Sequence, residues 1–206
     1  MKISAIEKQK KDRQRYNIFM DGEFYSGLYE DTIVKYGLRT GDELSEADME
    51  KIRSYDEFNY AKTSAYRFLA YRQRSKKEMI LRLKQKKISL PSINKVIKLL
   101  EEQKYLNDEV FAYNFIKEKI KNKPLGKRVL ADKLREKGIS SEISEKVLKE
   151  NYSEEDEFLS AGIVLKKYLN KGKFKSEYDK KSKCYRHLLS RGFDYDIINS
   201  VLSEMK

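Results

Sequence analysis

The sequence predicts a mainly α-helical protein of three tandem three-helix, helix-turn-helix-like repeats, with a small N-terminal β-hairpin or antiparallel sheet element. Three observations support this fold class. Hydrophobic residues recur with helical spacing from Ser45 to the end, a similar pattern of helices appears three times, and residues 16–28 have the features of a β-hairpin. Hydrophobic and charged residues contribute 39% and 38% of the 206 residues, a balance that favours an elongated protein with a thin core.

We expect four segments along the chain. Residues 1–45 form the N-terminal β-hairpin element, and residues 46–104 form a linker helix and a basic first repeat. Residues 105–152 form the second three-helix repeat and residues 153–206 form the third. Because three short helices enclose only a small core, neighbouring repeats are expected to bury surface against each other.

The N-terminal element is predicted from one turn and its flanking residues. Asp21-Gly22 separates two aromatic-rich runs, and both residue types tolerate the positive φ angles of a tight hairpin turn. Residues 3–6 are expected to add a third strand, with basic residues within 8–15 guarding the exposed edge. A short helix is expected over residues 31–36, before Gly37.

Capping residues mark where several helices begin. Side-chain oxygens of Ser, Thr, Asn and Asp can accept hydrogen bonds from the free N–H groups of a first helical turn, and proline is tolerated there. The predicted caps are Ser45 with Asp48, Ser75 with Glu78, Pro91 at the start of a third helix, Ser153 with Asp156, and Ser176 with Asp179.

The repeat becomes visible when residues 134–139 are aligned with residues 188–193. In both stretches a leucine is followed by a glycine, Gly138 or Gly192, and then by isoleucines and valines at matching positions. The first repeat matches with one inserted residue, and Lys87 occupies the position of the glycines. These three positions lie about 50 residues apart, a spacing typical of repeat proteins. The glycines are predicted to end the middle helices in the left-handed conformation.

Positive charge is concentrated in the first repeat. The net charge is −3 for residues 1–61, +11 for residues 62–100, and +2 each for residues 101–152 and 153–206, within a total of +12. A block of this kind attracts phosphate groups or acidic protein surfaces, although a role in solubility alone is the alternative.

The sequence offers no pattern typical of catalysis or of a cofactor site. The glycines are scattered, so no phosphate-binding loop is predicted, and acidic residues such as Glu154 to Glu157 look like favourable charges at a helix N-terminus. Cys184 and His187 are too few for a structural zinc site and are expected to be packing residues. We therefore expect no enzyme activity, no metal and no cofactor. With neither a membrane-spanning run nor a signal peptide, a soluble, cytoplasmic protein is expected.

One apolar residue stands among the cations of the first repeat. A helical wheel places Leu81 opposite Met79, Ile80 and Leu83, on the side of the basic residues. Leu81 either anchors a partner or contacts another helix of the chain. The aromatic side chains suggest base stacking, but Tyr66, Phe68, Tyr105, Phe111, Tyr113 and Phe115 follow helical periodicity, which favours the core.

Several motifs resemble the RecX family of regulatory proteins. These are Arg72-Gln73-Arg74-Ser75 with Glu78 and Leu83, then Tyr105-Leu106-Asn107-Asp108 with Phe111-Ala112, then Gly126 with Leu134 and Lys137-Gly138-Ile139. The resemblance covers roughly residues 56–206, and the N-terminal hairpin resembles an extension seen in some members.

The resemblance implies a regulator of the RecA recombinase filament on single-stranded DNA. Members look like elongated modules that lie in the filament groove and restrain strand exchange, ATP hydrolysis and co-protease activity. We expect a monomer that contacts DNA directly or through the filament and has no membrane partner. The expected contact residues are Leu81 and the cations Arg72, Arg74, Lys77, Arg82, Lys84, Lys127, Arg128 and Arg135.

A tandem helix-turn-helix DNA-binding protein is the alternative interpretation. Short helices joined by tight turns and a basic surface also describe that class. However, no single helix offers the set of asparagine, glutamine and arginine residues expected for reading base edges.

Overall fold

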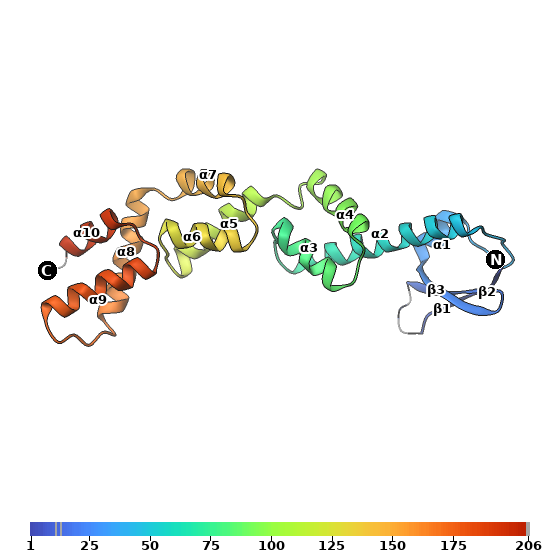
Figure 1. Cartoon of the computed structure of the whole chain (residues 1–206), viewed down its shortest axis with the longest axis horizontal. Coiled ribbons are helices and arrows are strands. Elements are labelled where there is room, and N and C mark those ends of the chain that lie inside the picture. Colours follow the sequence, from blue (N-terminus) through green and yellow to red (C-terminus); the bar gives the residue numbers. More distant parts are fainter. Residues whose placement is uncertain (11, 13, 205–206) are drawn as a thin grey trace. The chain divides into compact units, whose positions relative to one another are not determined.

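The computed structural model describes residues 1–10, 12 and 14–204. These residues form a three-stranded sheet followed by ten helices, labelled in chain order in Figure 1. They divide into two compact units, one of residues 1–74 and 79–106 and the other of residues 75–78 and those from 107 onward. The predicted mainly α-helical fold with a small N-terminal sheet is confirmed.

The N-terminal sheet is antiparallel, and its strands lie in the order β1-β2-β3. The strands are β1 (Ile3–Lys8), β2 (Arg15–Met20) and β3 (Glu23–Tyr29). Asp21 and Gly22 both have positive φ, 49° and 90°, as a tight turn between β2 and β3 requires. The predicted hairpin and third strand are therefore confirmed. Within the basic stretch expected to guard the edge, positions 11 and 13 lie outside the described residues.

A long helix joins the sheet to the first repeat. After α1 (Glu30–Tyr36), α2 (Glu46–Tyr71) begins where the Ser45 hydroxyl accepts a hydrogen bond from the Asp48 N–H at 3.1 Å. The start of α2 packs Met49 and Ile52 against the sheet core, while Ala61 and Ala65 belong to the core of the first repeat. The linker and the first helix of the repeat are thus one continuous helix.

The first repeat consists of α2, α3 (Lys76–Gln85) and α4 (Leu90–Glu102). Pro91 lies in the first turn of α4, as predicted. The α3–α4 turn contains Lys87 with a φ of 60°, so this lysine has the left-handed conformation found at the equivalent glycines. The buried core includes Ala61, Ala65, Met79, Leu83, Ile93, Val96, Ile97 and Leu100.

The second compact unit contains two further three-helix groups, each with its own core. These are α5 (Asp108–Asn122), α6 (Lys127–Glu136) and α7 (Ser141–Asn151), and then α8 (Glu154–Leu169), α9 (Glu177–Ser190) and α10 (Tyr195–Ser203). Ser153 forms a capping box with Asp156, and Ser176 accepts from the Asp179 N–H. Gly138 and Gly192 have φ angles of 84° and 87°, so both predicted left-handed caps are confirmed.

The same contact recurs twice within this unit, between the start of one middle helix and the end of the next. The Ser75 hydroxyl at the start of α3 donates to the carbonyl of Lys137 at the end of α6, at 2.6 Å. The Gly126 N–H at the start of α6 donates to the carbonyl of Arg191 at the end of α9, at 3.0 Å. In both contacts a carbonyl left free at a helix end accepts a hydrogen bond, from a hydroxyl in the first case and from a backbone N–H in the second.

Four of the six aromatic residues expected mostly in the core do pack there, Tyr66, Phe68, Phe111 and Phe115, and two do not. Tyr105 and Tyr113 are 57% and 38% exposed, although helical periodicity placed them in the core. Tyr105 follows the end of α4, where the wheel no longer applies, and its ring meets Tyr66 edge-on at 5.7 Å between centroids. His187 stacks on Tyr168 at 4.1 Å, and Cys184 is buried, in agreement with packing roles.

Candidate partner-binding surface

Helix α3 presents a clear division between a buried and an exposed side. Met79 and Leu83 are fully buried, whereas Leu81 is 50% exposed. Arg82 and Lys84 are also exposed, one residue before and one residue after Leu83. The helical wheel therefore predicted the division correctly, and the apolar Leu81 side chain lies open to solvent on the same side of the helix as exposed cations.

The cations on α3 and just beyond it differ in the groups that their side chains contact. Arg82 donates to the Gln85 side chain on the same helix at 3.2 Å, a contact that leaves its charge uncompensated. Lys84 forms no ion pair with any described residue. Lys86, just beyond the helix, lies over the rings of Tyr60 and Phe68 at 5.3 and 6.0 Å. Aromatic support of this kind fixes a lysine without neutralising it.

The two arginines before α3 have unlike environments. Arg72 is exposed at the end of α2, and its guanidinium donates to the carbonyl of Gln73 at 2.9 Å. Arg74 is only 6% exposed, donates to the Phe68 carbonyl and lies 5.4 Å from the centre of the Phe68 ring. Arg74 thus anchors the α2–α3 turn, a role that its place in a basic run did not indicate.

Three of the remaining predicted contact residues lie at contacts between helices of different repeats. Lys77 donates to the carbonyl of Glu136 at 3.1 Å, and Arg128 donates to the carbonyl of Leu189 at 2.7 Å. Lys127 forms an ion pair with Glu157 at 3.2 Å. Arg135 is exposed on α6 and pairs with Asp132 at 2.6 Å. These side chains bind helix ends or acids within the second unit, so Leu81, Arg82 and Lys84 on α3 are the ones more available to a partner.

The sequence did not indicate the partners of two acidic residues. Glu78 pairs with Lys137 at 2.7 Å, and Glu157 is 1% exposed. Glu157 belongs to a run of four acids that looked like exposed N-terminal charge, and its position four residues after the Ser153 cap is the signal that it turns inward. Both carboxylates hold helix ends together, and each neutralises the lysine that it pairs with.

Two further properties of the described residues concern metal ions and membranes. No group of three or more His, Cys, Asp or Glu side chains among them is arranged to hold a metal ion. In the same part of the chain, no helix is both long and apolar enough to cross a membrane.

The fold and this surface define a tandem three-helix-repeat protein with an N-terminal β element and cations concentrated on its first repeat. Four family models match the chain in sequence order. They are the regulatory protein RecX N-terminal domain over residues 1–45 and the first, second and third RecX three-helix domains over residues 61–100, 107–148 and 155–202.

Curated relatives and solved structures agree with the family models. Regulatory protein RecX from Staphylococcus aureus strain Newman is 33% identical over 204 residues, which cover 99% of this chain and 74% of the relative. A crystal structure of regulatory protein RecX matches 98% of this chain and 99% of its own, with a TM-score of 0.74 and 24% identity. A crystal structure of RecX from Lactobacillus salivarius matches 73% of this chain and 97% of its own, with a TM-score of 0.68 and 26% identity. The chain belongs to the RecX family of regulatory proteins.

Proposed function

We propose that this chain is a non-enzymatic regulator that binds the RecA recombinase filament on single-stranded DNA. It lies in the filament groove across adjacent protomers and restrains strand exchange, ATP hydrolysis and co-protease activity. The family membership of the chain supports this proposal, as does the concentration of charge in residues 62–100, which contain 12 basic residues and one acid. A filament groove offers both acidic protein surface and DNA phosphates to such a segment.

The observation that carries the proposal is the exposure of Leu81 among cations. An apolar side chain that is 50% exposed on a basic helix has no role in the core of the first repeat. At protein interfaces, an apolar anchor surrounded by a charged rim contributes much of the binding energy. Phosphate binding alone would require no leucine at this position, so Leu81 favours a partner that includes protein.

The remaining predicted contact residues have a narrower role in this proposal. Arg82 and Lys84 supply the electrostatic attraction beside Leu81 on α3. Arg72 and Arg135 are exposed cations elsewhere that add to the attraction for an anionic partner. Arg74, Lys77, Lys127 and Arg128 act mainly by holding helix ends, because Arg74 contacts the preceding helix and the other three contact a helix of another repeat.

Filament-dependent ATP hydrolysis tests this function. Adding the protein to RecA on single-stranded DNA is expected to lower the steady-state rate of hydrolysis in a dose-dependent and saturable manner. The control is bovine serum albumin at equal concentration. An unchanged rate over the full range of concentrations, together with binding to naked DNA, would favour the tandem helix-turn-helix DNA-binding protein instead.

A further inference from the structure

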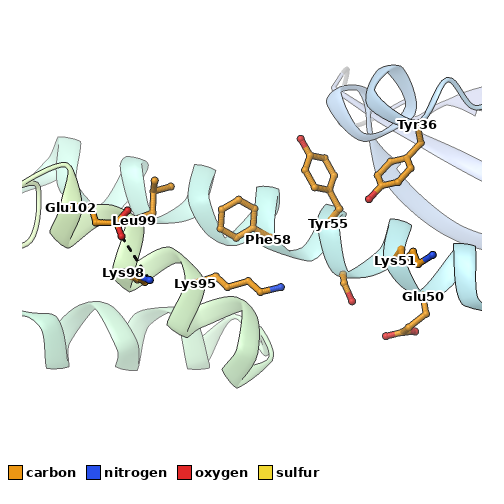
Figure 2. A pocket seen from close by; sticks show the side chains of 10 residues that line it. Tyr36, Glu50, Lys51, Tyr55, Phe58, Lys95, Lys98, Leu99 and Glu102 are labelled. Carbon is orange, nitrogen blue, oxygen red and sulfur yellow. Dashed lines mark ion pairs between the residues drawn. The ribbon is translucent and has the colours of Figure 1, made fainter.

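A groove in the first compact unit lies among α1, α2 and α4, and none of its lining residues belongs to α3 (Figure 2). Its volume is about 700 Å³, within the range of sites that enclose several side chains. Phe58 and Leu99, both half-buried, form an apolar floor, and Tyr55 and Tyr36 extend it toward the end of α1.

The rim of the groove carries three lysines and two glutamates, a small excess of positive charge. Lys51 pairs with Asp48 at 3.8 Å and Lys98 pairs with Glu102 at 4.0 Å, and both are loose pairs at exposed positions. Lys95 forms no ion pair with any described residue. Two glutamates also lie on the rim. Glu50 is held by Arg53 at 2.9 Å, and Glu102 is the loose partner of Lys98. Lys95 is therefore the rim cation most available to an anion, and Lys51 and Lys98 can exchange partners because exposed pairs of this kind contribute little.

The aromatic rings of the groove are arranged for a side chain rather than for a stacked base. The Lys35 ammonium lies over the Tyr55 ring at 4.2 Å, and Tyr36 meets the same ring edge-on at 5.6 Å. Since both contacts occupy Tyr55, a nucleobase gains no open stacking platform there. The two rim glutamates also repel a regularly charged phosphate backbone, whereas the acids of a peptide can be spaced to avoid them.

We propose that this groove binds an acidic peptide segment of a protein partner, with one aromatic or aliphatic side chain of the peptide inserted over Phe58 and Leu99. Carboxylates on either side of that anchor pair with Lys95, Lys98 and Lys51. The arrangement matches the usual anatomy of a peptide site, in which an apolar anchor enters a pocket and charges at the rim select the partner. The site is independent of the α3 surface, so either assignment can fail without the other.

The chain contains no tryptophan, which allows a direct binding assay. Tyr36→Trp introduces a single tryptophan at the groove, at a position that is 39% exposed. The probe is a synthetic ten-residue peptide of aspartates and glutamates around one central phenylalanine. Its titration is expected to change the tryptophan emission saturably. The same peptide with lysine at every acidic position, and single-stranded oligothymidylate of equal charge, are expected to cause no saturable change.

Substitutions at the rim and the floor locate the site. Lys95→Glu with Lys98→Glu, in the Tyr36→Trp background, is expected to weaken peptide binding at least tenfold. The matched control, Lys149→Glu with Lys181→Glu, reverses two exposed lysines outside the groove and should leave the affinity within twofold. Ser54→Phe, at an exposed lining position, fills the groove without removing a core contact and should also weaken binding at least tenfold.

Three results would overturn the proposal. They are equal affinity for the acidic and basic peptides, unchanged peptide affinity in the Lys95 and Lys98 double variant, and saturable binding of oligothymidylate that competes with the peptide. The last result would assign the groove to nucleic acid.

Discussion

The carboxylate of Glu157, buried on α8, holds the start of α6 through Lys127. One oxygen of this carboxylate accepts from the Lys127 backbone N–H at 2.9 Å, and the other pairs with the Lys127 ammonium at 3.2 Å. Asp108 of α5 plays the same part at the start of α3, where it accepts from the Lys76 N–H at 2.9 Å. An acid on the first helix of one repeat thus caps the middle helix of the repeat before it.

Removing this buried carboxylate should destabilise the second unit. Glu157→Ala is expected to lower the free energy of unfolding by about 1.5–3 kcal/mol, the range for a hydrogen bond that involves a charged group. Chemical denaturation monitored by circular dichroism measures the change. Glu145→Ala, at an exposed position on α7, should change stability by less than about 0.5 kcal/mol. Equal effects of the two substitutions would mean that Glu157 does not join the repeats.

Two glycines in the second unit should respond to alanine with opposite signs. A Cβ atom at Gly126 would lie 2.1 Å from the carbonyl oxygen of Gly192, whereas one at Gly162, within α8, would meet nothing within 4 Å. Gly126→Ala should therefore destabilise the protein by about 1–3 kcal/mol. Gly162→Ala should stabilise it by about 0.5–1 kcal/mol, because alanine favours a helix interior. Thermal melts of both variants test this, and a stabilising Gly126→Ala would contradict the close approach of the two backbones.

Lys87 tests the equivalence of the three repeats. Its φ of 60° costs a lysine energy that glycine avoids, and the matching positions in the other repeats are glycines. Lys87→Gly should raise stability by up to about 1 kcal/mol, after the added entropy of the unfolded chain is deducted. Lys84→Gly, inside α3, should lower it by about 1 kcal/mol. If both substitutions destabilise the protein equally in urea denaturation, Lys87 is not strained.

Local signals in the sequence predicted the elements of this fold, and long-range contacts account for what was missed. The hairpin turn at Asp21-Gly22, the helix starts at the serine caps and the helix end at Gly138 each depend on residues within four positions of each other. The burial of Arg74 and Glu157, in contrast, depends on partners in other helices, which a helical wheel does not represent. Leu81 was predicted correctly because its exposure depends only on the orientation of α3 toward its own core.

Asp56 should make stability depend on pH. It is 6% exposed, and burial raises the pKa of its carboxyl, although hydrogen bonds from the Tyr29 N–H and the Thr32 hydroxyl and the charge of Arg15 oppose this shift. The folded state therefore binds the proton more tightly than the unfolded chain does. The resulting stabilisation is fully present below the ordinary pKa of aspartate and is lost as the pH rises through the raised pKa.

The comparison of the parent protein with Asp56→Asn isolates this effect, because the other titrating groups are common to both. The stability of the parent relative to the variant should increase as the pH falls from 7 to about 4, near the ordinary pKa of aspartate. Urea denaturation at a series of pH values measures the difference. A difference that stays constant, or that decreases toward low pH, would contradict the assigned direction of the shift.

Leu81→Ala should separate binding from stability. Because Leu81 is 50% exposed, its truncation should change the free energy of unfolding by less than about 0.5 kcal/mol. Leu83→Ala, two residues away and fully buried, should cost about 2–5 kcal/mol. Leu81→Ala and Lys84→Glu should each weaken binding to RecA-coated DNA while keeping the melting temperature of the parent. A large drop in melting temperature for Leu81→Ala would move the contact surface elsewhere.

The affinity for RecA-coated single-stranded DNA, compared with the affinity for the same DNA without RecA, tests the proposed function most directly. Fluorescence anisotropy at physiological salt provides both values, with labelled protein and matched DNA lengths. A protein that bound phosphates alone would lose affinity for naked single strands with a log–log salt slope of about −0.7 for each phosphate contacted. We predict clearly tighter binding to the coated strand, reduced by Leu81→Ala. Equal affinity for coated and naked DNA would contradict a filament regulator and support a DNA-binding protein.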